Sequence, residues 1–335
     1  MTSADTAVSK EGLTIPLIDF SKFAAGSPEE RKETADAILH GFQDAGFIYL
    51  KNHPVSADAL KHTFARSADF FAQPLEDKLA LGWTTPEANR GYSSPGREKV
   101  SHHFNSDDVE KERAAAPDLK ESFEIGREGE PDHPNHWPAE NGSLANWKAD
   151  MLDFYAQCKA LHVEVMRAIG IGMGLGDSFF DNFVDVGDNT LRLLHYPEVK
   201  SEVFKINAGQ VRAGAHSDYG SITLLFQDQR GGLQVQSPSG QFVDATPIPG
   251  TVVVNAGDLL SRWSNDTIKS TVHRVVEPPS QDSTHPPRYS IAYFCNPNFT
   301  SQIEVLPGTY KTEADKKYGG INSGDYLVQR LKATY

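Results

Sequence analysis

The residues with the clearest potential for chemistry begin with a His-x-Asp pair, His216 and Asp218. On a β-strand, side chains two positions apart point to the same face, so this imidazole and carboxylate would converge on one point. His273 follows 55 residues later (273 − 218 = 55), enough chain for a neighbouring strand to bring a second imidazole there. Two histidines and one carboxylate on one face leave coordination positions open, which suits Fe(II) and oxygen chemistry. A surface His-x-Asp with an unrelated core histidine explains these three residues equally well.

A strand expected over residues 288–295 favours the metal site. Arg288, Ser290, Ala292 and Phe294 would share one face of it. An arginine that faces the inside of a barrel costs free energy unless an anion meets it. The guanidinium can bind a carboxylate at two points, and the Ser290 hydroxyl can add a donor. We therefore expect a carboxylate-bearing molecule close to the metal.

The strand expected over residues 191–196 repeats this pattern, with Arg192, Leu194 and Tyr196 on one face. If that face points inward, Arg192 brings a second cation into the cavity. The alternative is an exposed arginine on an outer face. Asp258, which follows an Asn-Ala-Gly turn, is expected to cap a helix and not to bind metal.

The elements that must position these residues are mainly β, with helices added. Short strand-like runs punctuated by Gly and Pro recur at 190–196, 210–216, 221–227, 233–236, 241–244, 251–254, 271–276 and 288–295. Their spacing predicts an antiparallel double-stranded β-helix, or jelly roll. Helices are expected over about 27–45, 56–71, 143–168 and 324–335, and a short one from Pro74.

Three regions follow from this division. Residues 1–185 form an N-terminal helical and mixed region whose helices pack on one sheet, 186–300 the catalytic core, and 301–335 a C-terminal helical segment; together they are expected to form one catalytic unit. Residues 83–140 are irregular apart from a strand candidate at 121–125, and we interpret them as a loop over the active site.

Composition narrows the possible partners. The 335 residues carry a net charge of −13 with no cluster of Lys and Arg, which argues against a nucleic-acid partner. No apolar run approaches roughly 18 residues, so no membrane partner is expected. Two cysteines cannot build a disulfide framework, and a reducing cytoplasm is the expected location. We therefore expect a small-molecule substrate. No sequence pattern indicates the oligomeric state.

An ordered set of motifs identifies a family. The chain resembles the isopenicillin-N-synthase-like group of iron(II)/2-oxoglutarate dioxygenases at residues 15–20 (IPLIDF), 46–53 (GFIYLKNH), 90–92 (RGY), 191–197 (LRLLHYP), 216–218 (HSD), 231–235 (GGLQV), 255–258 (NAGD), 273–275 (HRV) and 288–290 (RYS). This resemblance implies Fe(II) at His216, Asp218 and His273, with 2-oxoglutarate and O2 as cosubstrates and ascorbate as a stimulant. It also implies that the far carboxylate of 2-oxoglutarate meets Arg288, Ser290 and Tyr196.

Four stretches look more specifically like the fungal thymine-hydroxylating members of this family: residues 82–92, 191–197, 216–226 and 293–298. The implied reaction oxidises the methyl group of free thymine to 5-hydroxymethyluracil, 5-formyluracil and uracil-5-carboxylate, releasing succinate and CO2. One departure is Leu194, where many plant members have Asn, so one polar contact to the cosubstrate is missing.

The residues themselves suit such a substrate. A flat pyrimidine could stack on Phe294, accept a hydrogen bond from Arg192 and be closed in by Tyr219, with Leu194 on the same face. Ordinary filling of the barrel is the alternative for Phe294. Two other functions remain open: a family member acting on another small molecule, of secondary metabolism or ethylene-forming type, and a cupin-like metal-binding roll without oxygenase activity.

Overall fold

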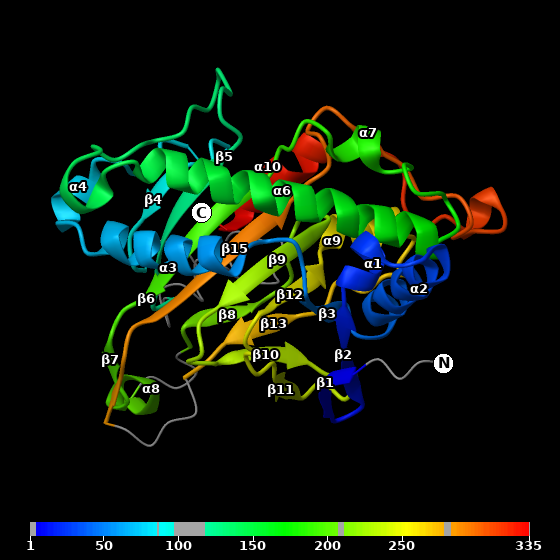
Figure 1. Ribbon diagram of the computed structural model, residues 1–335, viewed down its shortest axis with the longest axis horizontal. Helices are drawn as coiled ribbons and strands as arrows, with labels where there is room; N and C mark the ends of the chain where they lie inside the picture. The colour runs from blue at the N-terminus through cyan, green and yellow to red at the C-terminus, as the bar shows by residue number, and fades with distance from the viewer. Residues whose placement is uncertain (1–4, 86, 97–117, 207–210, 278–282, 335) are drawn as a thin grey trace.

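The computed structural model describes residues 5–85, 87–96, 118–206, 211–277 and 283–334. A large twisted sheet runs through the molecule, with helices on one side and a smaller sheet on the other (Figure 1). Its strand order is β1-β2-β3-β12-β9-β15-β6-β5-β4. The bounds are β1 Asp5–Lys10, β2 Leu13–Asp19, β3 Phe47–Lys51, β12 Thr251–Ala256, β9 Ile222–Gln227, β15 Arg288–Cys295, β6 Thr190–Tyr196, β5 Glu121–Gly126 and β4 Gly91–Ser93.

The smaller sheet has the order β11-β10-β13-β8, with bounds Phe242–Asp244, Leu233–Gln236, His273–Val275 and Ala213–His216. Apolar side chains of both sheets meet in one core, among them Phe47 and Val253 from the large sheet and Val235 and Val275 from the small one. Two largely antiparallel layers around a shared interior, with one parallel pair between β2 and β3, make the double-stranded β-helix that the strand spacing predicts. This prediction of the fold is confirmed.

Helices cover the outer face of the large sheet (Figure 1). They are α1 Ser21–Ala25, α2 Pro28–Asp44, α3 Ala57–Phe71 and α6 Trp147–Gly172. Helix α2 begins with the expected capping box, in which the Ser27 and Glu30 side chains each accept a hydrogen bond from the other residue's backbone N–H.

Alternation along the strands divides the large sheet into an apolar outer face and a mixed inner face. Leu191 and Leu193 of β6 lie in the core beneath the helices, whereas Leu194 and Tyr196 of the same strand lie in the core between the sheets. Burial of the leucines beneath the helices therefore fixes which side chains of β6 point into the barrel, including Arg192.

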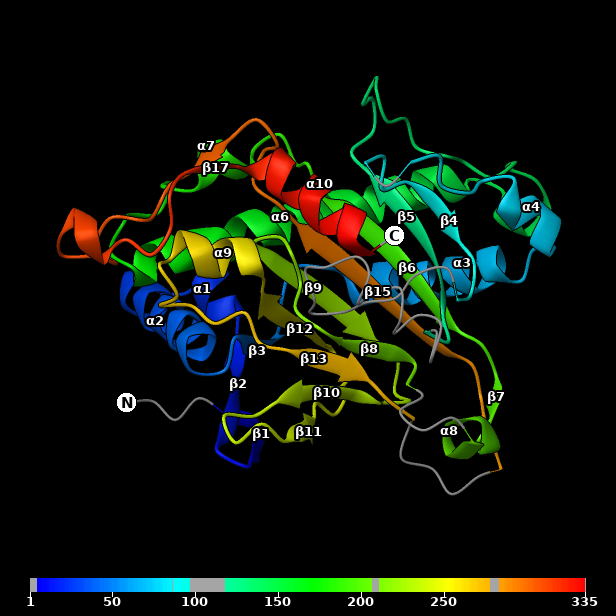
Figure 2. The same ribbon diagram turned by 180° about the vertical axis from the view of Figure 1, so that it is seen from behind.

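The remaining elements complete the chain. They are α4 Leu75–Leu79, η1 Gly142–Leu144, α7 Asp181–Val184, β7 Val199–Lys200, α8 Glu202–Ile206, α9 Asp258–Trp263, β14 Thr284–His285, β16 Gln302–Ile303, η2 Glu313–Asp315, β17 Ile321–Asn322 and α10 Ser323–Thr334. Figure 2 shows α10 lying beside β6 and β15, on the side of the large sheet opposite α6. Among the helices of the described segments, none has the length and apolar character needed to cross a membrane.

Three features differ from the sequence-based expectation. The sequence does not predict strand β1, because its residues are mostly polar. It forms an edge hairpin with β2. Glu11 and Gly12 make the turn, and both have positive φ, as two-residue hairpin turns require. Helix α6 begins four residues later than expected, after a 3₁₀ turn, and continues to Gly172. The irregular region contributes a second strand, β4, as well as β5, and its residues 97–117 lie outside the described part.

The two cysteines occupy different elements of the interior. Cys158 lies in α6 and Cys295 ends β15, and both are free thiols with no solvent exposure. Burial raises the pKa of each thiol well above its ordinary value. Both are therefore un-ionised structural residues and not nucleophiles.

Candidate active site

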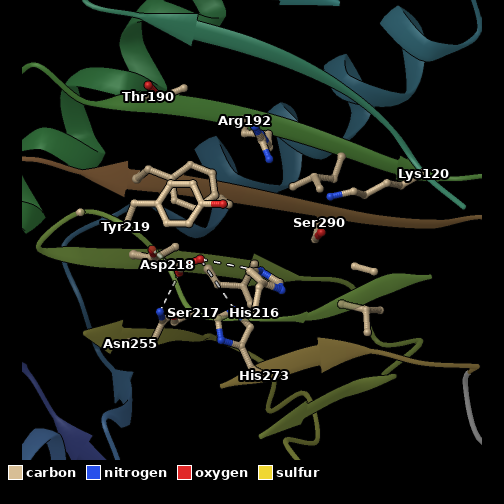
Figure 3. A pocket seen from close by; sticks show the side chains of 18 of the residues that line it. Lys120, Thr190, Arg192, His216, Ser217, Asp218, Tyr219, Asn255, His273 and Ser290 are labelled. Atoms are coloured by element: carbon tan, nitrogen blue, oxygen red, sulfur yellow. Dashed lines mark hydrogen bonds and ion pairs between the residues drawn. The ribbon is translucent and has the colours of Figure 1, made fainter. Parts of the chain in front are cut away.

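The structure brings His216, Asp218 and His273 together. His216 at the end of β8 pairs directly with His273 at the start of β13, and Asp218 follows two residues after β8. The Nε2 atom of each histidine lies 3.8 Å from Asp218 Oδ1, and one ligand atom from each of the three residues lies within 4.8 Å of the others. Figure 3 shows the three side chains converging from the small sheet toward the cavity. Two imidazoles and one carboxylate on one face are the donor set expected for ferrous iron.

Hydrogen bonds orient each of these side chains. Asp218 Oδ2 accepts from Thr223 Oγ1 (2.5 Å) and Asn255 Nδ2 (2.7 Å), so that Oδ1 is turned toward the histidines. The Nδ1 atoms of His216 and His273 lie 2.7 and 3.2 Å from the carbonyl oxygens of Gly214 and Thr271. A carbonyl can only accept, so each Nδ1–H donates and each Nε2 keeps its lone pair for a metal.

The electrostatics favour the protonation states that a metal needs. Burial, together with the neighbouring His273, lowers the pKa of His216 far below its ordinary value, so this imidazole stays neutral. Burial alone would raise the pKa of Asp218, but His273, His216 and the two hydrogen-bond donors lower it overall. A neutral imidazole and an ionised carboxylate can bind a cation without first losing a proton.

The wall opposite this centre is built by three neighbouring strands whose side chains form rows. Along the register of β15 and β6, Arg288 lies opposite Tyr196, Ser290 opposite Leu194, Ala292 opposite Arg192 and Phe294 opposite Thr190. Strand β5 adds Glu124 opposite Arg192. These β15 and β6 side chains line one cavity together with His216, Asp218 and His273. The prediction that 288, 290, 292 and 294 share the face of the metal residues agrees with this placement.

Arg288 lies at one end of the cavity and is 1% exposed. Its guanidinium donates to Gly231 O, Ser290 Oγ and Gln227 Oε1, and its Cζ lies 4.8 Å from the centre of the Tyr196 ring. Within the described part of the chain, no carboxylate lies within ion-pair distance of it. A buried arginine with only neutral partners keeps an uncompensated charge and is suited to bind an anion.

Arg192 lies further along the same wall, in a different electrostatic setting. Its Nε is 2.7 Å from Glu124 Oε1, and Glu124 Oε2 accepts from Trp83 Nε1 at 2.7 Å. Its Cζ lies 5.2 Å from the centre of the Phe294 ring. The exposed alternative for Arg192 is wrong, since the residue is 8% exposed and lines the cavity.

The remaining substrate candidates also line the cavity. Leu194 lies on its wall, and Tyr219 closes its edge with the Arg330 guanidinium carbon 4.4 Å from the ring centre. Arg330 belongs to α10, which also places Leu327 and Leu331 against the cavity.

Several residues of the site were not foreseen. Glu124 could have been found, because the alternation of the predicted strand at 121–125 puts it on the face of Ser122. Asn89, Lys120, Leu327 and Leu331 also line the cavity. Asn89 lies in the stretch 82–92 that carries the family resemblance, whereas Lys120 and the two leucines come from a strand entry and a distant helix without a recognisable motif.

The expectation that Asp258 caps a helix is wrong. Helix α9 begins at Asp258 with Gly257 as N-cap and without a side-chain cap. The carboxylate instead accepts hydrogen bonds from Ser217 Oγ (3.1 Å) and Ser270 Oγ (2.7 Å), and Arg330 Nη2 lies 3.5 Å from it. Because Ser217 lies between His216 and Asp218, Asp258 braces the segment that carries two of the metal-binding residues.

Comparison with known proteins agrees with this geometry. A family model of the 2OG-Fe(II) oxygenase superfamily matches residues 187–297, and one of the N-terminal region of the non-haem dioxygenase in morphine synthesis matches residues 15–141. A proline hydroxylase from Petromyces alliaceus is 34% identical, over 96% of this chain and 100% of its own length. The chain belongs to the 2-oxoglutarate/Fe(II)-dependent oxygenases.

Two solved structures of this oxygenase family are much more similar. Full-length thymine 7-hydroxylase from Neurospora crassa, in complex with α-ketoglutarate and thymine, is 70% identical, with a TM-score of 0.93 over 99% of this chain and 100% of that one. The same protein in complex with α-ketoglutarate and 5-formyluracil is 67% identical, with a TM-score of 0.91 over 98% of this chain and 99% of that one. For a 2-oxoglutarate/Fe(II) oxygenase, the metal is ferrous iron, the cosubstrate is 2-oxoglutarate, and the His216, Asp218 and His273 cluster fits the iron.

Proposed function

We propose that this oxygenase oxidises the methyl group of free thymine, in successive steps to 5-hydroxymethyluracil, 5-formyluracil and uracil-5-carboxylate, and releases succinate and CO2. The observation that carries the proposal is the Arg192–Glu124 ion pair beside the Phe294 ring. At this end of the cavity Phe294 offers a flat aromatic surface, and Arg192 offers hydrogen-bond donors while its positive charge is neutralised by Glu124. Such a site suits a flat, neutral molecule with ring carbonyls.

Relatives support this choice of substrate. The N. crassa enzyme, 70% identical, has been crystallised with thymine and with 5-formyluracil, a later product of the proposed series. The proline hydroxylase is only 34% identical, so it supports the choice of substrate much less strongly. The net charge of −13 favours a free base over a base within DNA.

Each residue then has a separate role. His216, Asp218 and His273 hold the iron, and Arg288 with Ser290 and Tyr196 holds the far carboxylate of 2-oxoglutarate. Phe294 stacks on the pyrimidine, Arg192 donates to a ring carbonyl, and Tyr219 and Leu194 limit its movement. The bound iron supplies the oxygen chemistry that 2-oxoglutarate decarboxylation drives. The apolar side chains of Leu225, Ala292 and Leu327 keep water out of the cavity.

Turnover tests the substrate directly. The protein is incubated with Fe(II), ascorbate, 2-oxoglutarate and either thymine, uracil or proline, and both succinate and the oxidised product are measured. We expect thymine-dependent succinate and a stepwise series of pyrimidine products. Absence of thymine turnover, together with oxidation of another small molecule from a wider panel, would refute thymine as substrate while keeping the oxygenase.

The placement of the cosubstrate has its own test. Under anaerobic conditions, Fe(II) and 2-oxoglutarate should together give a weak visible charge-transfer band. Arg288→Met should raise the 2-oxoglutarate concentration needed for that band by about a hundredfold, because a buried charge-assisted pair is lost. If the band forms at the wild-type concentration of 2-oxoglutarate in this variant, the far carboxylate does not bind at Arg288.

A further inference from the structure

Arg212 is a second buried arginine near the cosubstrate end, and the proposed reaction does not yet use it. It lies immediately before β8, and its backbone N–H donates to Val275 O at 2.8 Å. The side chain has no solvent exposure. Its Nε, Nη1 and Nη2 atoms are all shielded, and none has a hydrogen-bond partner among the described residues.

Such a side chain is costly to bury. Burial and repulsion from Arg288 lower the pKa of Arg212 to about 10, so the guanidinium remains charged at neutral pH. Asp228 and Glu277 are the carboxylates that attract it, but both have other hydrogen-bond partners. Asp228 accepts from the backbone N–H groups of Tyr289 and Arg230, and Glu277 Oε1 lies 2.5 Å from His285 Nε2. A positive charge of this kind is retained at a free-energy cost, which calls for a function.

The position of Arg212 indicates that function. Its Cζ lies 5.8 Å from the centre of the Tyr196 ring, and Arg288 Cζ lies 4.8 Å from the same centre. Two guanidinium groups therefore flank one tyrosine. Arg288 and Tyr196 line the cavity, whereas Arg212 does not. Arg212 stands behind the wall and can act on a ligand only through its charge and through Tyr196.

We propose that Arg212 is a positioning residue for the cosubstrate, a positive charge additional to Arg288 that attracts the far carboxylate of 2-oxoglutarate and steadies the Tyr196 ring. This rests on the proposed placement of that carboxylate at Arg288 and Ser290. The two guanidinium carbons are at most about 11 Å apart, because both distances end at the centre of the Tyr196 ring. At an effective dielectric constant of about 20, a unit charge at about this distance changes affinity on the order of tenfold. The effect concerns the far carboxylate alone, because the 2-oxo acid end of the molecule belongs to the iron.

The test compares 2-oxoglutarate with pyruvate, which has the 2-oxo acid end but no far carboxylate. Both are titrated anaerobically into the Fe(II)-loaded protein, and dissociation constants come from the charge-transfer band or from calorimetry. Arg212→Met should weaken 2-oxoglutarate on the order of tenfold and leave pyruvate and thymine within twofold. Arg212→Lys keeps the charge and should stay within about threefold of wild type for 2-oxoglutarate.

Stability of the metal-free protein provides a second readout. Removing a buried charge without a partner should leave the melting temperature of Arg212→Met unchanged or higher, while the shift produced by 2-oxoglutarate with Fe(II) becomes smaller. Arg212→Gln is a second uncharged variant, read in the same way if the methionine variant does not fold. Arg274→Met is the matched control, since Arg274 stacks on Phe242 at 3.9 Å and bonds Gln234 on the same small sheet.

The outcomes separate the two proposals. Three results would overturn the inference and leave Arg212 a structural role only. Arg212→Met could bind 2-oxoglutarate with wild-type affinity, or its affinity for pyruvate could fall as much as that for 2-oxoglutarate. It could also have a lower melting temperature with an unchanged shift on adding 2-oxoglutarate and Fe(II). If Arg288→Met also leaves the preference for 2-oxoglutarate over pyruvate unchanged, the placement of the far carboxylate itself fails.

Discussion

Charge is compensated at one end of the cavity and uncompensated at the other. Arg192 has Glu124 as its counter-charge, whereas Arg288 has only neutral hydrogen-bond partners among the described residues. In the proposed function, the same residue type serves two purposes on neighbouring strands. We expect Arg192, beside Glu124, to donate a hydrogen bond to a neutral ring, and Arg288, beside Ser290, to bind an anion.

Glu124→Gln tests this distinction at the substrate end. The amide can still accept from Trp83, but it no longer neutralises Arg192. We expect the KM for thymine to rise by about three- to tenfold and inhibition by uracil-5-carboxylate to strengthen, because the freed guanidinium favours a carboxylate. Steady-state kinetics with added uracil-5-carboxylate measure both effects. Glu128→Gln, a half-exposed carboxylate paired with Lys148, is the control, and equal inhibition in both variants would contradict the argument.

Asn255→Ala tests the hydrogen bonds that orient the metal-binding carboxylate. Asn255 supplies one of two donors to Asp218 Oδ2. Its loss should weaken iron binding by about 10- to 100-fold, as is typical for partners of metal ligands, with little effect on the overall fold. Competition with a chelator measures the iron affinity, and Asn52→Ala, a surface amide bonded to Asp19, serves for comparison. Iron affinity equal to wild type would show that Thr223 suffices.

At the scale of elements, strand alternation is the part of the site that sequence predicts well. In β15 and β6, buried leucine, isoleucine and tyrosine side chains under the helices force the intervening residues inward, so the inner faces follow from period-two patterning. The same logic applied to β5 would have included Glu124. Asn89, Lys120 and Leu331 lie outside long strands, where side-chain direction depends on turns and tertiary packing that no short pattern records.

Helix α10 provides an element-scale prediction. Its Leu327 and Leu331, one turn apart, line the cavity. The double change of Leu327 and Leu331 to Ala should open that wall to water and raise the KM for thymine by about tenfold. More succinate should then form without oxidised pyrimidine, while the affinity for 2-oxoglutarate stays unchanged. The ratio of succinate to oxidised pyrimidine is the measurement. Gln329→Ala, exposed on the same helix, should behave as wild type; unchanged coupling in the double variant would remove α10 from the site.

At the scale of the whole molecule, the layered core couples folding to pH through His162 of α6. The residue has no solvent exposure, and neither ring nitrogen has a hydrogen-bond partner among the described residues. Burial, with a contribution from Lys159, lowers the pKa of His162 from 6.5 to about 3. The folded state keeps the ring neutral, whereas the unfolded chain takes up a proton below its ordinary pKa.

The sign of the pH effect follows from this difference. The unfolded state binds more protons below about pH 6.5, so the free energy of unfolding due to His162 is constant above that pH and falls by about 1.4 kcal/mol per pH unit below it. Denaturant unfolding of wild type and His162→Leu between about pH 5 and pH 8 tests this. The variant should gain on the wild type only in the acidic half of the range, and parallel curves throughout would contradict the assignment.

Because both thiols are buried, their chemical modification can measure how fast the core opens. Cys158 and Cys295 are the chain's two cysteines and have no exposed surface, so a thiol-reactive reagent cannot reach either one in the folded molecule. With reagent in excess, modification should proceed only as fast as the core opens, and its rate reports the opening of α6 and β15 without any engineered label. Because binding to the folded state alone slows such opening, the same rate should fall in turn with Fe(II), with 2-oxoglutarate and then with thymine, and each fall reports how far that occupant slows the opening of the core.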